Sequence, residues 1–383
     1  MLATLILSQS ITQAYSATAS QDVQPKGNAA PLHRTLESKS QSYLKARQLL
    51  GETFRRYDTD RYILLSDADP DWTRQQGRYL ERTYHQFHRF TKWLELQPLP
   101  LQHKLVCILF QNRASYQRFA ATHDGISAPW IAGYFSPKHD WTAFYHIEAS
   151  PSLSAAREQL SRMNTELRRL EAKAKDAAAN NSADLTGLNE RVALYRDHLK
   201  KQQLRVNVFA TETSTATTIH EGVHQLMFHT RIQSPLRVYP LWISEGLAMN
   251  FETTTPNQAF GPQFDSPLRH EQFEEVLRNQ ELISLSKLIE LEVHPPNEEK
   301  TMRTIYAQSY GLIAYLSRFH RPELRHYLES MRINAPIHLG SGQQRSIFIQ
   351  CFGDPDKLEA RWLRYEHARL AANGPTASST TSH

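Results

Sequence analysis

Hydrophobic and polar positions recur with two different periods in the first part of the chain. Short apolar runs, which are typical of buried strands, occupy residues 61–66 and 105–110, and weaker ones lie near residues 131–135 and 142–147. Spacings of three and four predict an amphipathic helix that ends before Pro98, carrying Leu80, Tyr84, Phe87, Phe90 and Leu94. A short helix is expected around residues 116–121. The pattern therefore predicts a small α/β unit.

After residue 150 the pattern changes to a longer repeat. Apolar residues at alternating spacings of three and four run through residues 153–177 and again through residues 185–199, with charged residues between them. The polar residues 180–182 separate the two runs, which predicts an antiparallel helical hairpin with a coiled-coil seam. Two roles stay open for this hairpin. It is either an insertion that packs on itself, or an arm that contacts a protein partner or limits access to a site.

The remaining chain reads as one further strand followed by helices. Apolar and polar residues alternate over residues 204–210, which predicts a half-exposed strand. A helix over residues 215–229 follows, with Ser214 or Thr215 as its N-cap. Beyond Glu252 the expected helices cover residues 271–277, 285–291, 304–319, 323–332, 345–352 and 355–370. This order of elements predicts an α+β protein.

The helix predicted at residues 215–229 carries the sequence His-Glu-Gly-Val-His, at residues 220–224. His220 and His224 are four residues apart, so on a helix they lie about 40° apart around the axis and both imidazoles can reach one metal ion. Glu221 projects between them and can reach a metal-bound water without being a ligand. A catalytic zinc site needs three protein ligands and one open position, so one ligand is still required.

The run Trp-Ile-Ser-Glu-Gly-Leu-Ala at residues 242–248 supplies that ligand in Glu245, because a carboxylate on a second helix can complete the set. By chance, HExxH is expected in roughly 0.05 chains of this length and histidine content. The competing explanation, two surface histidines on an ordinary helix, leaves the second motif unexplained. We therefore predict one Zn²⁺ per chain, bound by His220, His224 and Glu245.

These motifs resemble those of the gluzincins, zinc peptidases that hold the metal with the two histidines of HExxH and a glutamate on a later helix. The resemblance implies a zincin-like metallopeptidase fold, with the hairpin inserted between a small N-terminal α/β part and a helical C-terminal part. It also implies that Glu221 is the general base. The runs at residues 217–252 and 306–316 further resemble a bacterial family of exported, peptidase-like proteins of unknown function.

Two more expectations follow from the resemblance. Gluzincins often stabilise the oxyanion with a Tyr or His from the C-terminal helical part, which makes Tyr306 and Tyr310 candidates; packing in the core is the competing explanation. Aminopeptidase-type gluzincins carry a Gly-x-Met-Glu-Asn segment upstream of HExxH, and no such segment precedes His220. The resemblance therefore gives exopeptidase activity no support.

The predictions divide the chain into seven parts: a candidate signal peptide (1–19), a linker (20–45), an N-terminal α/β subdomain (46–150), the hairpin (151–201), the zinc-binding core (202–255), a C-terminal helical subdomain (256–370) and a disordered tail (371–383). Residues 2–7 are apolar and residues 17–19 offer a small-x-small cleavage site, although no basic region precedes them. Export to the periplasm or the extracellular space is expected, and a cytoplasmic location stays open.

Composition narrows the functional classes. The chain of 383 residues has a formal charge of +5 without a dense basic block, which does not indicate nucleic-acid binding. No apolar stretch approaches the roughly 18 residues of a membrane span. Cys107 and Cys351 are too few for a disulfide framework, so they form either two free thiols or a single bridge.

The expected activity is zinc-dependent hydrolysis of internal bonds in a peptide or protein substrate. The predicted strand at residues 204–210 could hold an extended substrate beside the zinc helix by β-augmentation. The alternatives are a zinc-binding protein without catalysis and a coiled-coil interaction protein. His229 is not expected to be a ligand, because about 900° of helix rotation places it on the opposite side of the helix from His220. At the end of the helix, a protonated His229 would suit the helix dipole.

Overall fold

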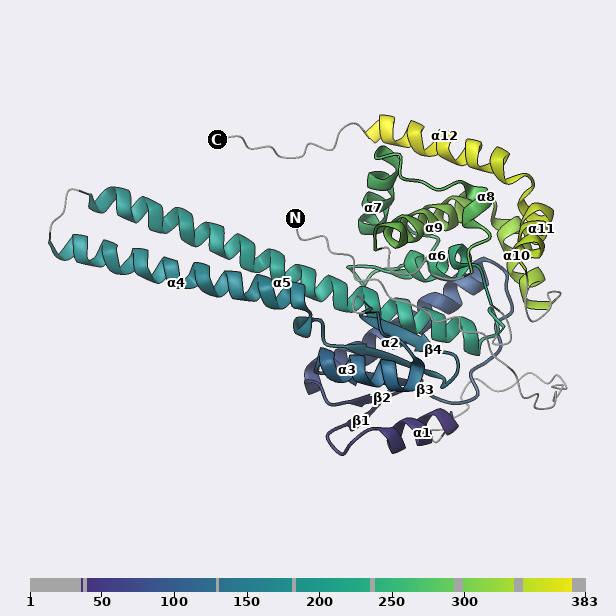
Figure 1. Cartoon of the computed structure of the whole chain (residues 1–383), viewed down its shortest axis with the longest axis horizontal. Helices are drawn as coiled ribbons and strands as arrows, with labels where there is room; N and C mark the ends of the chain where they lie inside the picture. Colours follow the sequence, from purple (N-terminus) through teal and green to yellow (C-terminus); the bar gives the residue numbers. More distant parts are fainter. Residues whose placement is uncertain are drawn as a thin grey trace.

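The computed structural model describes residue 36 and residues 40–128, 131–180, 184–234, 238–292, 299–333 and 340–373. The candidate signal peptide, most of the predicted linker, Asn181 and Ser182 at the predicted turn, and residues 374–383 lie outside these ranges. A small sheet lies on one side of a long helix, a group of helices lies on the other, and a helical hairpin extends away from both (Figure 1). The predicted α+β class is therefore confirmed.

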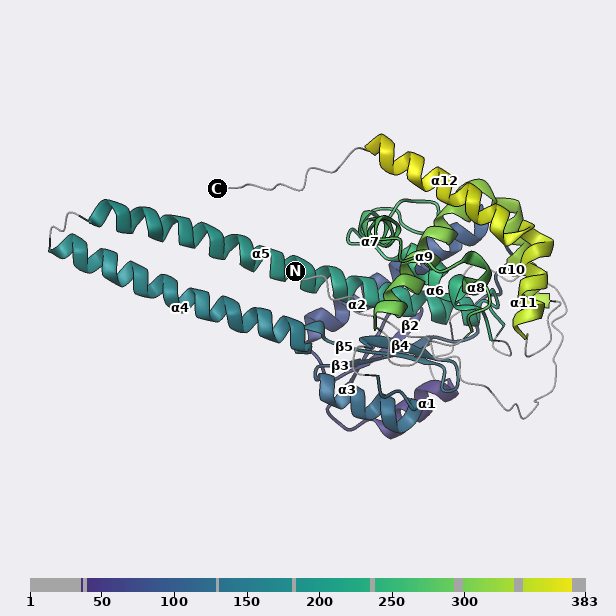
Figure 2. The same cartoon turned by 45° about the horizontal axis from the view of Figure 1, so that its top comes forward.

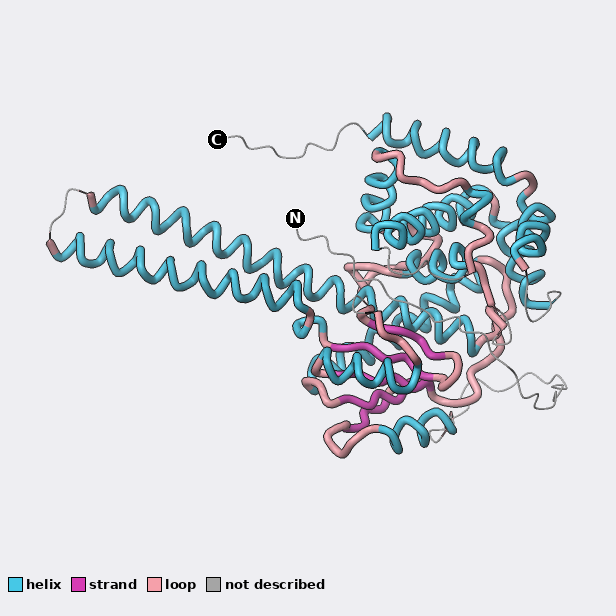
Figure 3. Tube along the Cα trace, viewed as in Figure 1, coloured by secondary structure: helices cyan, strands magenta, loops and turns pink. Residues whose placement is uncertain are grey.

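The sheet has five strands in the order β1-β2-β3-β5-β4 (magenta in Figure 3). β2 (Tyr62–Ser66), β3 (Leu105–Phe110) and β5 (Trp141–Tyr145) are parallel neighbours, while β1 (Arg55–Asp58) and β4 (Gly133–Ser136) run antiparallel at the two sides. The four predicted strands of the α/β unit are thus confirmed. The sequence reasoning missed β1, whose residues are mostly exposed and lack an apolar run.

Both faces of the central strand β3 are buried, because its side chains alternate between two cores. Leu105, Cys107 and Leu109 join the core formed with α2 (Pro70–Trp93) and α5 (Leu185–His229). Val106 and Ile108 join the core on the other face, with α1 (Gln41–Leu49), α3 (Arg113–Phe119) and the π-helix η1 (Ala120–Asp124). The sheet is therefore the middle layer between two helical layers, as the turned view in Figure 2 shows.

The predicted hairpin is confirmed and consists of α4 (Pro151–Ala179) and the first half of α5. A short 3-10 helix (Ile147–Ala149) leads into it, and the Ser150 hydroxyl accepts a hydrogen bond from the Leu153 amide to cap α4. The seam between the two helices is a separate small core made of Leu167, Leu170, Ala174, Val192 and Leu199. The apolar residues of the seam therefore cover one another along the hairpin.

The strand predicted at residues 204–210 is wrong, because α5 continues without interruption from Leu185 to His229. Val206 and Ala210 are 3% and 6% exposed, whereas Leu204 and Val208 are 62% and 43% exposed. The buried pair is spaced by four, which is the helical period, and over seven residues this pattern is hard to distinguish from alternation. Ser214 and Thr215 are consequently not N-caps. Thr215 lies inside the helix, where its hydroxyl donates to the Thr211 carbonyl oxygen at 2.8 Å.

The C-terminal part is helical, as predicted, and covers the side of α5 that faces away from the sheet (Figure 1). Its helices are α6 (Leu241–Phe251), α7 (Pro267–Arg278), α8 (Leu285–Leu288), α9 (Glu299–Phe319), α10 (Arg321–Ile333), α11 (Ser341–Phe352) and α12 (Pro355–Asn373). They share one core with α2 and α5. α6 packs between α5 and α9, so the segment that carries Glu245 is held against the segment that carries the two histidines.

Two boundary predictions change, and the open alternative for the cysteines is settled. The predicted linker ends earlier than residue 45, because α1 begins at Gln41, with the Ser40 hydroxyl accepting from the Tyr43 amide. The predicted tail begins later than residue 371, because α12 extends to Asn373. Cys107 and Cys351 are free thiols, which excludes the single bridge. Among the described residues, none of the helices combines the length and the apolar character that crossing a membrane requires.

Candidate metal centre

α5 presents His220, Glu221 and His224 to the interior between the sheet and α6. All three side chains are buried. The two imidazole rings have centroids 4.8 Å apart, and their Nε2 atoms are 3.0 Å apart. The four-residue spacing therefore does what the sequence reasoning expected: it aims two ring nitrogens at one point.

Glu245 reaches the same point from α6. Its Oε2 lies 3.2 Å from Nε2 of His220, and its Oε1 lies 3.6 Å from Nε2 of His224. The three donor atoms form a triangle with every side within 4.8 Å. In tetrahedral zinc sites with bonds of about 2.0 to 2.1 Å, neighbouring donors are about 3.3 Å apart. Two imidazoles and one carboxylate at these separations fit a zinc ion without rearrangement of the backbone.

Glu252, which follows α6, supports the first histidine. Its Oε1 lies 2.8 Å from Nδ1 of His220, and its Oε2 accepts a hydrogen bond from Nε of Arg269 at 2.7 Å. A carboxylate on Nδ1 fixes the ring orientation and leaves Nε2 free to ligate, an arrangement that strengthens metal binding. The sequence reasoning missed both residues. The sequence signal that could have identified Glu252 is its position as a charged residue directly after the apolar run of α6.

The charges of these groups depend on one another. Burial alone lowers the pKa of His220, but the carboxylates of Glu245 and Glu252 raise it to about 10. Burial alone raises the pKa of Glu245, and the two histidines lower it well below its usual value. Arg269 and His220 likewise outweigh burial and lower the pKa of Glu252. A metal ion replaces the imidazole proton when it binds, because histidine ligates in its neutral form.

The side chain of Glu221 extends from α5 toward the outer strand β4. A Cβ atom on Gly133 of β4 would lie 3.2 Å from Cγ of Glu221 and 2.9 Å from the methyl group of Thr217. Glycine at this position therefore lets the strand approach the helix closely. The fully buried Glu221 carboxylate acts electrostatically on His220 and on Tyr306, raising the pKa of each. The predicted base is thus buried close to His220, its neighbour in α5, and to Tyr306.

The two candidate tyrosines occupy different places on α9. Tyr306 is buried beside Glu245, and burial together with that carboxylate raises its pKa well above the usual value. The hydroxyl of Tyr310 instead donates to the carbonyl oxygen of Ser266 at 3.3 Å. Tyr310 therefore supports the segment before α7, and Tyr306 is the one of the two that borders the metal-ligating groups.

Residues 214–338 match a family profile described as "Protein of unknown function (DUF1570)". The matched segment begins one and a half turns before His220 and continues through α9, so it contains His220, Glu221, His224, Glu245 and Tyr306. It excludes all five strands of the sheet, α4 and residues 185–213 of α5. No curated protein matches the chain. The match thus concerns the segment that forms the site, and its description assigns no activity.

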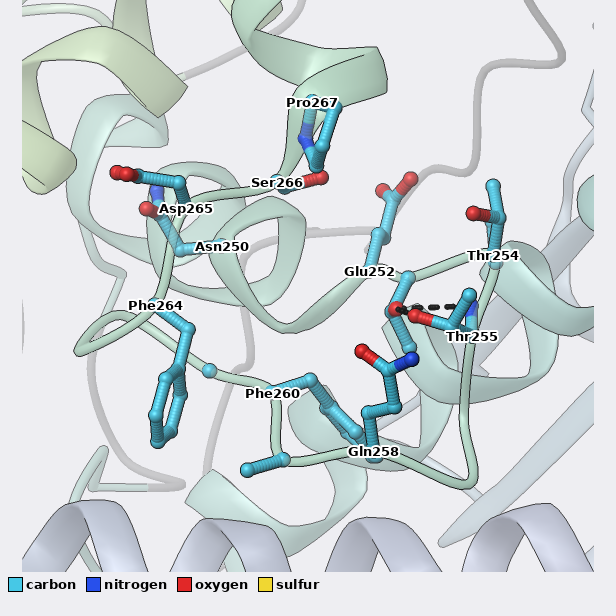
Figure 4. Close-up of a pocket in the computed structure, with 14 residues that line it drawn as sticks. Asn250, Glu252, Thr254, Thr255, Gln258, Phe260, Phe264, Asp265, Ser266 and Pro267 are labelled. Atoms are coloured by element: carbon cyan, nitrogen blue, oxygen red, sulfur yellow. Dashed lines mark hydrogen bonds between the residues drawn. The ribbon is translucent and has the colours of Figure 1, made fainter.

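A pocket of about 300 Å³ borders the site on the side of Glu252. Its lining comes from the end of α6, from the segment that leads to α7, and from Ala216 one turn before His220 on α5. Figure 4 shows Glu252 between Thr254 and Ser266, with Phe260 and Gln258 on the opposite wall. The hydrogen bond that Nδ1 of His220 donates to Glu252 therefore connects this pocket to the three donor atoms.

His229 does not join this cluster, as predicted. Its Nε2 lies 2.5 Å from Oδ1 of Asp140, which stands in the turn between β4 and β5. It is the last residue of α5, as the sequence reasoning expected.

Proposed function

We propose that this protein is a zinc-dependent hydrolase of peptide bonds. The observation that carries the proposal is the convergence of Nε2 of His220, Nε2 of His224 and a carboxylate oxygen of Glu245, together with the buried carboxylate of Glu221, which acts electrostatically on His220. A site that only stores a metal has no use for a second buried carboxylate in this position. Catalytic zinc sites combine three such ligands with a base.

Zinc bound there would lower the pKa of a coordinated water toward about 7 and polarise the carbonyl of the scissile bond. Glu221 accepts the proton of the attacking water and passes it to the leaving amine. Tyr306 stands beside Glu245, where its hydroxyl can donate to the oxygen on which negative charge develops. Glu252 and Arg269 orient His220 and take no part in proton transfer.

Cleavage of internal bonds remains the finer hypothesis. The absence of an aminopeptidase segment still supports it, but the predicted substrate-binding strand is gone because residues 204–210 are helical. β4 is the strand that could instead pair with an extended substrate. It is the last strand on its side of the sheet, and Gly133 brings it against Glu221. An extended substrate paired with β4 would pass close to the base at any point along its backbone, which suits an endopeptidase.

A second candidate function rests on burial. The side chains of His220, His224 and Glu245 are at most 2% exposed, and closed zinc sites are commonly structural. A catalytically silent zinc protein, which presents its hairpin to a partner, is therefore the alternative. An active enzyme must open a path to the site, and the pocket beside Glu252 is one place where such a path could begin, because Glu252 contacts His220.

Incubation of the zinc-loaded chain with unfolded casein, followed by mass spectrometry, tests the proposal. Glu221→Gln should retain about one zinc per site and lose a factor of about 10² to 10⁴ in cleavage rate. Glu212→Gln, two turns earlier on α5, is the matched control and should cleave normally. Equal cleavage by the Glu221 variant would refute the assigned base. Absence of cleavage by the zinc-loaded native chain would favour the silent zinc protein.

A further inference from the structure

A second cluster of side chains that could bind a metal lies at the C-terminal end of α5, beyond His220 and His224. It consists of His103, Asp140 and His229. His103 precedes β3 and Asp140 precedes β5, and these parallel strands are neighbours, so both residues stand at the same edge of the sheet. His229 arrives from the last turn of α5. Three segments far apart in the sequence thus deliver two imidazoles and one carboxylate to one place.

The geometry of the cluster resembles that of a metal site. Nε2 of His229 lies 2.5 Å from Oδ1 of Asp140, and Nε2 of His103 lies 3.8 Å from Oδ2. The three ligand atoms all lie within 4.8 Å of one another. These distances bracket the separation of about 3.3 Å between neighbouring donors in a tetrahedral zinc site. Small side-chain rotations are enough to seat an ion between the three groups.

Two neighbours orient the donors. Nδ1 of His103 lies 3.0 Å from the carbonyl oxygen of Lys104, which places its proton on Nδ1 and leaves Nε2 as the acceptor. The hydroxyl of Ser42, on α1, donates to Oδ2 of Asp140 at 3.1 Å. Metal-binding histidines commonly use their second nitrogen in this way, and their carboxylate partners are usually hydrogen-bonded. The orientation of His103 is an observation separate from the proximity of the three groups.

This cluster is independent of the candidate catalytic site. His229 is nine residues beyond His220, which corresponds to about 13 Å along the helix axis and to its opposite side. The two metals of a binuclear catalytic site are only about 3.5 to 4 Å apart. The second cluster therefore cannot share a substrate oxygen with the first, and its occupancy does not depend on the proposed hydrolysis.

The surroundings select the type of ion. Lys45 and Lys138 line the pocket of about 500 Å³ beside His103 and Asp140. Hard cations such as Ca²⁺ and Mg²⁺ rely on several oxygen ligands, and one carboxylate near two lysines does not supply them. Imidazole nitrogens suit Zn²⁺ and the neighbouring transition metals. We propose that His103, Asp140 and His229 form a second, partly exposed zinc-type site, whose remaining positions are filled by water or a small anion.

Such a site would fasten the end of the zinc helix to the sheet. Its three ligands come from the segment before β3, from the β4–β5 turn and from α5, and Ser42 adds α1 as a fourth element. A metal that binds only the folded chain stabilises it by mass action, by about 2.7 kcal/mol at 100 times its Kd. The ion would therefore make the unfolding of α5 dependent on metal concentration. Without an ion, Asp140 hydrogen-bonds to His229 and lies 3.8 Å from His103, and this arrangement is the competing outcome.

Zinc titration of the untagged apoprotein, with a chromophoric chelator as competitor, distinguishes the two outcomes. The native chain should take up two equivalents. His224→Ala, which removes a ligand of the first site, should still take up one, and adding His103→Gln to that variant should remove it. His198→Gln, an exposed histidine on α5, is the matched control and should change nothing.

A second measurement guards against misfolding. In the His224→Ala background, zinc should raise the thermal unfolding midpoint, and His103→Gln should abolish that rise while leaving the circular dichroism spectrum unchanged. Two results would overturn the proposal. One is a His224→Ala chain that binds no zinc although it is folded. The other is a His103→Gln or Asp140→Asn chain that keeps both equivalents with unaltered affinity.

Discussion

At Gly246, which follows the candidate ligand Glu245 on α6, the addition of a single methyl group should destabilise the fold most. α6 crosses α9 at this glycine. A Cβ atom there would lie 2.6 Å from the carbonyl oxygen of Ser309 and 2.7 Å from Cγ1 of Ile313. Backbone atoms cannot rotate out of the way, so Gly246→Ala forces the two helices apart. Roughly 0.8 Å of separation is needed to bring the contact of 2.6 Å to an ordinary distance of about 3.4 Å.

The expected magnitude combines two opposing effects. Alanine is intrinsically better than glycine inside a helix by about 0.5 to 1 kcal/mol. Overpacking a tight core contact costs about 1 to 3 kcal/mol. We therefore expect Gly246→Ala to lower the free energy of unfolding by about 1 to 2 kcal/mol. Zinc affinity should fall as well, because metal-ligand distances tolerate shifts of only about 0.2 Å and Glu245 moves with the helix.

Gly222, inside the HExxH motif, provides the matched control. A Cβ atom there would meet Cδ2 of Leu80 at 2.9 Å, which is the far end of a side chain that can rotate. Both glycines are buried, both lie in helices, and both adjoin metal-ligating or catalytic candidates. Gly222→Ala gains the same helix preference, so its free energy of unfolding should stay within about 1 kcal/mol of the native chain.

Urea unfolding followed by far-ultraviolet circular dichroism, with a chelator present, measures the difference without a contribution from bound zinc. Midpoints are compared at equal slope, because a chain of this size need not unfold in one step. Zinc affinity is measured separately by competition. A Gly246→Ala chain as stable as the native one would refute the reasoning, and so would a Gly222→Ala chain that loses more.

Two further predictions address single side chains. Glu252→Gln should weaken zinc binding by about 10- to 100-fold in a competition assay, because a neutral amide supports Nδ1 of His220 less well. The control is Glu81→Gln, which removes an ion pair with Arg61 instead and should leave the zinc affinity unchanged. Burial, with help from the positive charges of Arg61 and His85, lowers the pKa of His88 from 6.5 to about 4. As the pH falls from 6.5 to about 4, the unfolded chain protonates at His88 before the native chain does. The contribution of neutral His88 to native stability is therefore fully present above pH 6.5 and is lost progressively down to about pH 4. His88→Leu should flatten that decline in urea midpoints, and an undiminished slope would contradict the assignment.

The local elements and the convergence of His220 and His224 were predictable because they depend on neighbours within one or two turns. His220 and His224 converge through helical spacing alone, which holds wherever the helix packs. Leu105 to Phe110 could be identified as a buried strand from composition alone. Glu245 was found through its motif, but its distance from the histidines depended on how α6 packs against α5.

Other features depended on the tertiary structure because their residues are distant in the chain. Residues 204–210 fit both periods, and the helix prevails because Val206 and Ala210 pack against the core on the α1 and α3 face of the sheet. Glu252 supports His220 only because α6 returns to α5, and β4 reaches Glu221 only because it pairs with β5. The cluster of His103, Asp140 and His229 has no pattern along the chain. It forms because β3 and β5 are parallel neighbours and because the last residue of α5 lies near the residues that precede these two strands. Tertiary packing determines this arrangement, and local conformational preference does not.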